Sequence, residues 1–255
     1  VFQHRKALLV TRHGKEQVIG PPLREAFGIE LVTTDQPDTD LFGTFSGEVE
    51  RPGDQLATVR LKVEAACSAH TGADLLLASE GAFFPHPDSP FLMMNRELIL
   101  LKDQVHQLEC IGRSVNLAPG IMRVTVHSAA DALAQLPAFR FPAFGIILRA
   151  TDRHTGRLLL RKDCPSFAAV EAAVNELLPF AADGKVEMEH DLRAHRNSDR
   201  MGFIADAAAH LVRVMQRCCP ACGVPGFDVT DILPGLPCNW CGSPTRLVLA
   251  YPYTC

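Results

Sequence analysis

Four cysteines close to one end of the chain constrain its fold more than any other feature. They form two Cys-x2-Cys pairs, Cys219 with Cys222 and Cys238 with Cys241, and fifteen residues separate the pairs. Two such pairs at this spacing are typical of a tetrahedral zinc site with four thiolate ligands. A thioredoxin-type redox motif would account for one pair but not for two. We therefore predict a structural zinc site. Its four protein ligands would leave no coordination position for a substrate, so the site does not indicate a reaction.

The cysteine pairs also predict a division of the chain. A small zinc ribbon is expected over residues 217–255, after an α/β domain over residues 1–216. The 255 residues suffice for one large core and a small module. Hydrophobic residues make up 47% of the chain and charged residues 21%, which is typical of a globular protein and not of a disordered one.

Net charge and cysteine usage indicate which binding partners and which cellular compartment to expect. The net charge is −4, and the predicted ribbon carries two Arg and two Asp. It therefore lacks the basic face that phosphate neutralisation requires, which argues against a nucleic-acid partner. No secretory leader and no long apolar run is found, so we expect no membrane partner. Scattered free thiols beside zinc ligands favour the reducing cytoplasm, and the sequence leaves the oligomeric state open.

Apolar runs and helical periodicity alternate along the first half of the chain. Residues 7–11, 29–33 and 74–78 are predicted to be strands, and residues 16–27 and 54–71 helices. This alternation predicts an α/β fold with a mixed, mostly parallel sheet flanked by helices. In such folds ligands bind beyond the carboxyl ends of the strands. A proline-rich stretch over residues 83–95 is expected to form a lid-like loop.

Polar and charged residues gather in the predicted strand-to-helix loops and before the last long helix. They are His13, Lys15, Asp38, Asp40, Glu48, Arg51, Ser79, Glu80, Arg193, His195, Arg196 and Arg200, together with Lys62 on the second predicted helix. Carboxylates mixed with bases suit a phosphorylated substrate that binds with Mg²⁺. Basic side chains and a helix N-terminus would neutralise the phosphate charge. The alternative is that these residues form solvated surface ion pairs, each of which stabilises little.

Several of these segments are similar to those of an uncharacterised bacterial family of α/β proteins that end in a four-cysteine zinc ribbon. The resemblance covers nearly the whole chain. It is carried by the motifs His13-Gly-Lys-Glu16, Asp38-Thr-Asp40, Gly43-Thr-Phe-Ser-Gly-Glu48, Ala78-Ser-Glu-Gly81, Asp191-Leu-Arg-Ala-His195, Cys219-Pro-Ala-Cys222 and Cys238-Asn-Trp-Cys241. It implies an α/β domain with a zinc ribbon and no established activity.

The order of elements also resembles the inosine-triphosphate pyrophosphatase family and its septum-associated relatives. The turn Thr11-Arg-His-Gly-Lys15 is similar to the opening turn of those proteins, and Ser79-Glu80-Gly81 to their third-strand turn. His195-Arg196 looks like their base-reading turn. The resemblance implies an acidic role for Glu48 and an inward lysine role for Lys62.

These observations together predict Mg²⁺-dependent hydrolysis of a phosphoanhydride in a nucleotide or another phosphorylated small molecule. Glu48 and Glu80 would hold Mg²⁺, and water would be the nucleophile. Lys15, Lys62 and Arg51 would clamp phosphates. The predicted catalytic residues are Glu48, Glu80 and Lys62, and the predicted substrate-binding residues are His13, Lys15, Asp38, Asp40, Arg51, Ser79, Arg193, His195, Arg196 and Arg200.

A non-enzymatic role is the alternative class of function. In that case the zinc ribbon would bind a protein or nucleic-acid partner and the α/β domain would act as a scaffold. Trp240, between two predicted ligand cysteines, would contribute to a protein-contact patch.

Overall fold

A five-stranded mixed sheet forms the centre of the largest part of the protein. The structure is a computed structural model that describes residues 1–43, 52–118 and 120–255, with the side chain of Asp40 also left undescribed. The strands, in sheet order, are β2 (Glu30–Thr34), β1 (Lys6–Val10), β3 (Leu75–His86), β4 (Ser89–Asp103) and β5 (Leu108–Leu117). β1 pairs in parallel with β2 and β3, and β4 pairs antiparallel with β3 and β5. The predicted α/β class with a mixed sheet flanked by helices is confirmed.

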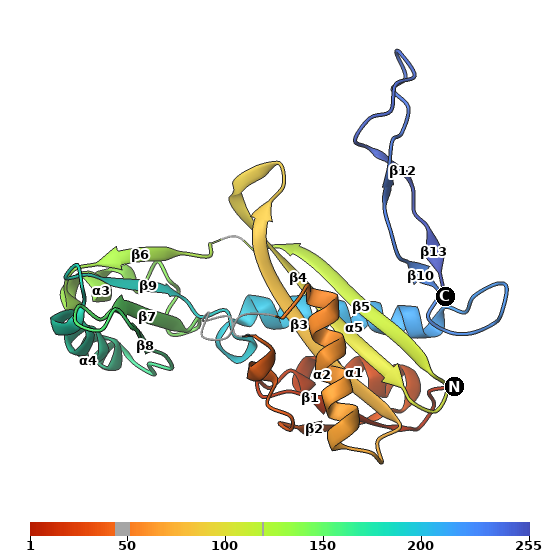
Figure 1. Cartoon of the computed structure of the whole chain (residues 1–255), viewed down its shortest axis with the longest axis horizontal. Coiled ribbons are helices and arrows are strands. Elements are labelled where there is room, and N and C mark those ends of the chain that lie inside the picture. The colour runs from red at the N-terminus through yellow and green to blue at the C-terminus, as the bar shows by residue number, and fades with distance from the viewer. Residues whose placement is uncertain (44–51, 119) are drawn as a thin grey trace.

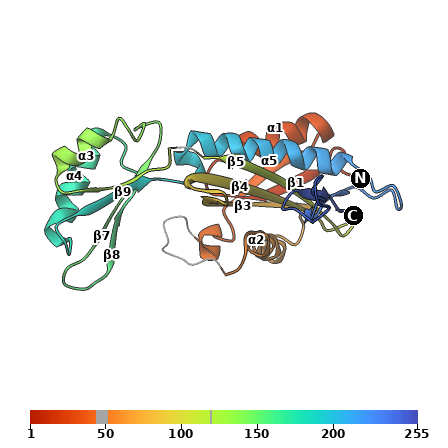
Figure 2. The ribbon, with the colours of Figure 1, turned by 90° about the horizontal axis from the view of Figure 1, so that it is seen from above.

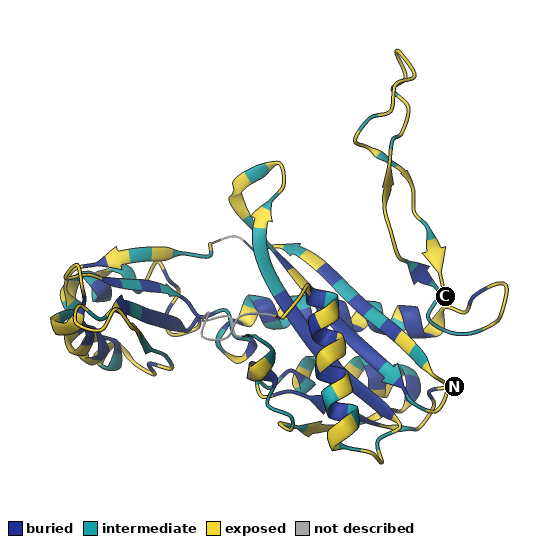
Figure 3. Ribbon diagram, in the orientation of Figure 1, coloured by how far each residue is buried: buried dark blue, intermediate teal, exposed yellow. Residues whose placement is uncertain are grey.

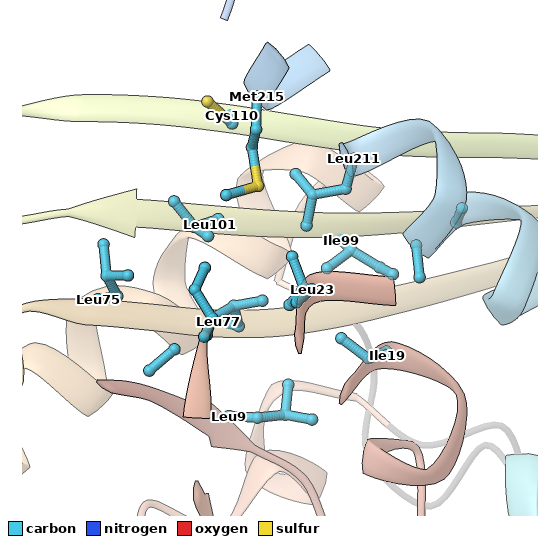
Figure 4. Packing of buried hydrophobic residues seen from close by; sticks show 14 of the residues in the cluster. Leu9, Ile19, Leu23, Leu75, Leu77, Ile99, Leu101, Cys110, Leu211 and Met215 are labelled. Carbon is cyan, nitrogen blue, oxygen red and sulfur yellow. The ribbon is translucent and has the colours of Figure 1, made fainter. Parts of the chain in front are cut away.

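Three helices cover the two faces of this sheet. α1 (Glu16–Phe27) and α5 (Ser198–Gln216) lie on one face and α2 (Gln55–Ala69) lies on the other (Figure 2). Successive strand residues point to opposite faces. Leu75 and Leu77 therefore pack with α1 and α5 (Figure 4). Leu76 and Ala78 pack with α2. We call this sheet and its three helices the large lobe.

The proline-rich stretch predicted to be a lid-like loop is instead the outer part of a long β3–β4 hairpin. The two strands pair continuously from Leu75 opposite Asp103 to Pro85 opposite Met93, and the register shifts between Pro85 and His86. The prolines lie at or beyond this irregularity, where a strand tolerates the missing N–H group. The prediction was wrong because proline content alone does not show whether a strand continues.

A second sheet forms a separate small lobe (residues 122–190). Its strands, in sheet order, are β6 (Arg123–Val126), β9 (Val186–His190), β7 (Ile146–Thr151) and β8 (Leu158–Arg161), all antiparallel. α3 (Ala129–Gln135) and α4 (Phe167–Leu177) contribute to its own cluster of buried apolar residues. The short turns η1 (Thr39–Phe42), η2 (Leu178–Phe180) and η3 (Ala194–Arg196) complete the two lobes. Residues 1–216 therefore contain two lobes side by side, each with buried apolar residues of its own (Figure 1).

Residues 217–255 extend from the end of α5 as a long hairpin, which we call the C-terminal arm (Figure 1). Its short strands are β10 (Asp228–Val229) with β13 (Tyr253–Thr254), and β11 (Leu233–Pro234) with β12 (Val248–Ala250). Cys219 and Asp228 are the only buried residues of this fully described segment (Figure 3). The arm therefore has almost no core of its own.

Within the described ranges, no helix is both long enough and apolar enough to cross a membrane.

Candidate functional site

The alternation of side chains along β3 and β4 places polar groups on both faces of the large-lobe sheet. Ser79 and Gly81 follow Leu77 on the face of α1 and α5, and Glu80 follows Ala78 on the face of α2. Ser79 and Glu80 were predicted in a loop after the strand, but they lie inside β3, because antiparallel pairing with β4 carries the strand on to His86. The polar residues therefore belong to the rigid sheet.

Lys15 occupies the turn between β1 and α1 and is buried. Its Nζ donates a hydrogen bond to Ser79 Oγ at 2.8 Å. Among the described residues, no carboxylate lies within ion-pair distance of this ammonium. Burial, followed by the positive charges of Arg200 and Lys62, lowers the pKa of Lys15 to about 7. The lysine is therefore a buried cation that lacks a direct counter-ion in the described part of the chain.

Lys62 of α2 meets Glu80 on the opposite face of β3. The Lys62 Nζ to Glu80 Oε2 distance is 2.5 Å, and both side chains are almost fully buried. Gln55, at the start of the same helix, donates from Nε2 to the carbonyl oxygens of Glu80 and Arg96. α2 is thereby attached to β3 and β4 by polar contacts next to the ion pair.

Arg200 and Glu97 form a second buried ion pair on the face of α5. Arg200 Nε donates to Glu97 Oε1 at 2.8 Å, and both side chains are at most 1% exposed. Asn95 donates to the same carboxylate, and a further Arg200 nitrogen donates to the carbonyl of Leu192. Gly81 faces Glu97 across the strand pair, and a Cβ there would collide with both ionic side chains. A side chain at this position would therefore have to displace one of these two ionic groups.

The 193–196 segment brings further basic residues to the Lys15 turn. The rings of His13 and His195 stack with their centroids 4.7 Å apart. Burial, and then the nearby charge of Lys15, lowers the pKa of His13 to about 3, so this ring is neutral near pH 7. Burial, and then Arg193, also lowers the pKa of His195.

Two arginines beside this stack contact Asp163 of the small lobe. Arg193 donates to Asp163 Oδ1 at 2.8 Å and also to Asp191. Arg196 Nε lies 3.6 Å from the same Asp163 oxygen. That Nε is buried and makes no hydrogen bond to the described residues. Loss of hydration without a replacement partner is costly, so this donor would gain from an acceptor.

A pocket of about 530 Å³ lies between the two lobes, next to the buried ion pairs. Ala82, the neighbour of Gly81, and Leu192, whose carbonyl accepts from Arg200, are among its lining residues. Phe83, Met93 and Ile147 add apolar surface. A cleft with apolar walls and a few convergent polar groups is the usual form of a small-molecule site.

The structure brings together most of the residues predicted to bind substrate. His13, Lys15, Ser79, Arg200 and the 193–196 segment adjoin one another. Asp38 forms an ion pair with Arg12 at 2.7 Å beside the same turn. The side chain of Asp40 is not described, and Glu48 and Arg51 lie outside the described residues.

Sequence reasoning missed the acidic partners of this cluster. Glu97 lies within β4, and Ile99 and Leu101 share its face of the sheet. A carboxylate in register with buried aliphatic residues was a usable signal for a buried ion pair. Asp163 gave no comparable signal, because its contact with Arg193 depends on how the lobes meet, whereas Asp191 lies only two residues from Arg193.

Only part of the donor set predicted for Mg²⁺ lies in the described chain. Carboxylate oxygens suit this ion, and Glu80 supplies them at the edge of the cluster. Lys62 holds one of those oxygens, so a bound Mg²⁺ would compete with this ammonium. Glu97 is fully enclosed by Arg200 and Asn95 and is not available to a hydrated ion.

The nine cysteines include one group that is suited to a metal. The sulfurs of Cys219, Cys222 and Cys255 lie within 4.8 Å of one another at the base of the arm. Cys238 and Cys241, which were predicted to complete a four-cysteine site, are not part of this group. Cys255 had no regular spacing in the sequence and was not among the predicted ligands.

The two Cys-x2-Cys segments have the same backbone geometry. In each, the N–H of the first cysteine donates to the carbonyl five residues later at 2.8 Å, and the glycine N–H donates back to the first cysteine at 2.8 Å. Gly223 and Gly242 both have φ of 72°, which favours glycine. Backbone N–H groups of Cys222 and Ala221 lower the pKa of Cys219 to about 7. Both turns thus have the conformation and donor chemistry of a thiolate metal ligand pair.

Comparison with known proteins gives a family but no activity. No curated protein matches this chain. The model of one protein family matches residues 62–255, a span that includes β3, β4, the small lobe, α5 and the whole arm. The chain therefore belongs to the family described as Domain of unknown function (DUF6671).

Proposed function

We propose that this protein is a Mg²⁺-dependent hydrolase that acts on a nucleotide or another phosphorylated small molecule. The observation that carries the proposal is the environment of Lys15. Its buried ammonium has a pKa of about 7 and no carboxylate partner among the described residues. A phosphate group next to Lys15 would supply the missing negative charge and acceptor atoms.

The surrounding groups support a phosphate site for a further reason. The cluster of two ion pairs plus Lys15 contains three cations, Lys15, Lys62 and Arg200, and two carboxylates, Glu80 and Glu97, among the described residues. The three cations lie in a buried region of low polarity, where electrostatic attraction to phosphate oxygens is strong. The adjoining pocket of about 530 Å³ would hold the remainder of the substrate.

In this proposal each side chain has a separate task. Lys15 and Lys62 neutralise phosphate oxygens, and His195 and Arg196 contact the base or the leaving group. Glu80 holds Mg²⁺, which keeps some of its water ligands and can polarise a phosphoryl oxygen. Glu48 and Arg51, the other predicted metal ligand and phosphate ligand, retain these roles as proposals outside the described residues.

Sulfate provides the direct test of the anion site, because it keeps two negative charges between pH 6 and pH 9. Its affinity should fall as the pH rises above about 7, by up to about tenfold per pH unit, because Lys15 then loses its charge. His13, with a pKa of about 3, does not contribute in this range. Isothermal titration calorimetry at several pH values measures the profile.

Substitutions of Lys15 test whether this residue causes the pH dependence of sulfate binding. Lys15→Met should bind sulfate weakly at every pH, and Lys15→Arg should bind it with little pH dependence, because the guanidinium stays charged. Lys185→Met is the matched control, since Lys185 is a half-exposed lysine paired with Asp183 in the small lobe. A wild-type profile that Lys15→Met leaves unchanged would contradict an anion site at Lys15.

Turnover tests the hydrolase itself. Release of phosphate and pyrophosphate is measured from a panel of nucleoside triphosphates, with and without Mg²⁺. Glu80→Gln should abolish release, while Glu109→Gln, in a surface ion pair with Arg60, should retain it. Full activity in Glu80→Gln would refute the metal assignment, and no release from any member of the panel would refute hydrolysis of nucleoside triphosphates.

The arm favours a second candidate, a non-enzymatic protein that binds a protein partner. Its exposed apolar side chains include Ile232, Leu233, Leu236, Trp240, Leu247, Leu249 and Tyr251. Trp240 is 96% exposed, which is unusual for so large an apolar group. The arm carries two Arg and two Asp, so a nucleic-acid partner remains disfavoured. Sulfate binding that is independent of Lys15, together with no turnover, would favour this candidate.

We also propose that the metal of the arm is zinc and that its role is structural. Thiolates are soft ligands that favour zinc among the common divalent ions, and both Cys-x2-Cys turns present them in the same geometry. The arm buries too little surface to order itself by hydrophobic contacts, and metal binding can supply that free energy.

A further inference from the structure

The base and the tip of the arm hold separate groups of cysteines. Cys219 and Cys222 lie in the turn that follows α5, and Cys255 follows β13. β10 and β13 pair with Val229 opposite Tyr253 and Asp228 opposite Thr254. This antiparallel register returns the chain to its starting point, so Cys255 Sγ lies 3.9 Å from Cys222 Sγ.

Cys238 and Cys241 lie between β11 and β12. The segment that joins these two strands forms the end of the hairpin away from β10 and β13 (Figure 1). Several ladder contacts lie between the two groups. They include Thr230 N–H to the Pro252 carbonyl, the pairing of Leu233 with Ala250, and Leu236 N–H to the Leu247 carbonyl. Moving the tip cysteines to the base would break this ladder. The register therefore keeps the two Cys-x2-Cys turns apart.

We propose that Cys219, Cys222 and Cys255 bind one zinc ion, and that Cys238 and Cys241 do not belong to that site. Three thiolates within 4.8 Å of one another can converge on one ion. The fourth coordination position is then filled from outside this group, by water or by another donor, because zinc is four-coordinate. This inference does not depend on the proposed hydrolase activity.

The neighbouring contacts give this site a mechanical role. Arg217, at the end of α5, contacts Asp228 through its guanidinium and lies over the ring of Tyr253. A metal bound by Cys219, Cys222 and Cys255 would join the end of α5 to the last strand of the arm at the same place. It would thus fasten the arm to the large lobe and leave the tip unattached.

The experiment measures metal binding in the full chain after removal of Cys238 and Cys241. Zinc content is determined by mass spectrometry of the elements. Cobalt is then titrated into the metal-free protein, and the thiolate-to-cobalt absorption is recorded. The double variant Cys238→Ser/Cys241→Ser should retain one zinc per chain and the thiolate band. Adding Cys255→Ser to this double variant should weaken cobalt binding at least tenfold.

Cys218→Ser is the matched control. Cys218 is exposed, adjoins Cys219 in sequence and lies outside the three-sulfur group, so its loss should leave metal binding unchanged. Circular dichroism verifies that each variant retains the fold of the two lobes. Loss of zinc from Cys238→Ser/Cys241→Ser, or undiminished cobalt binding after the Cys255→Ser change, would overturn the proposal and favour a site shared by the two Cys-x2-Cys turns.

Discussion

The large lobe and the C-terminal arm keep their polar groups in place by opposite means. In the large lobe, Lys62–Glu80 and Arg200–Glu97 are buried between the sheet and helices that an extensive apolar core already holds. In the arm, Cys219 is buried and its partners Cys222 and Cys255 are exposed. Packing therefore fixes the ionic cluster, whereas backbone pairing and the zinc ion that we propose would fix the cysteines.

The difference teaches where stability and function are coupled. Buried ion pairs contribute little net stability, yet removal of one partner leaves an uncompensated charge at high cost. The ionic cluster therefore cannot change without affecting the fold of the large lobe. The cysteines of the arm are tied to few packed residues, so their loss should affect the arm alone.

The largest expected effect concerns the buried pair of Arg200 and Glu97. Glu97→Ala would leave the guanidinium of Arg200 buried without its carboxylate and should lower the free energy of unfolding by about 3–5 kcal/mol. Urea denaturation measures the change. Glu109→Ala removes a carboxylate from a surface pair with Arg60 and should cost about 1 kcal/mol or less. Equal losses of stability in the two variants would show that the buried pair matters no more to the stability of the fold than the surface pair does.

A smaller effect is expected from adding one methyl group beside that pair. In Gly81→Ala the new Cβ would collide with Arg200 and Glu97, so the large lobe should lose about 1–3 kcal/mol of stability. Gly202→Ala is the control, because a Cβ there meets no atom within 4 Å on the exposed side of α5. It should stabilise the protein by up to about 1 kcal/mol. Thermal and urea unfolding of both variants give the comparison, and a neutral Gly81→Ala would contradict the tight packing.

The sequence predicted the large-lobe elements well, because their periodic patterns are local. Strands β1 and β2 and helices α1 and α2 lie close to their predicted bounds. Lys15, Ser79 and Glu80 were named because polar residues follow apolar strands, and Lys62 because of the family resemblance. The partnership of Glu97 with Arg200 was missed, since it depends on the register of β3 against β4 and on the position of α5.

Two other features of the structure could not be predicted from local sequence patterns. β6 and β8, with four residues each, are too short for periodicity to identify, so the separate sheet of the small lobe was not foreseen. Cys255 has no regular spacing to Cys219 or Cys222, and only the pairing of β10 with β13 brings it to them. Spacing predicts ligands within one turn, and strand register decides which distant cysteine joins them.

The smallest effect on the large lobe should come from metal removal. A chelator should abolish the amide-exchange protection of residues 217–255, because Cys219 and Asp228 are the only buried residues of that segment. The melting temperature of the large lobe should change by less than about 2 °C, since its clusters of buried apolar residues include no residue of the arm. Hydrogen-exchange mass spectrometry and calorimetry measure the two quantities on one sample. β3 and α5 serve as internal controls and should keep their protection. A fall of the melting temperature by about 5 °C or more would show that the arm and the large lobe unfold as one cooperative unit, because a ligand stabilises only the unit whose unfolding releases it.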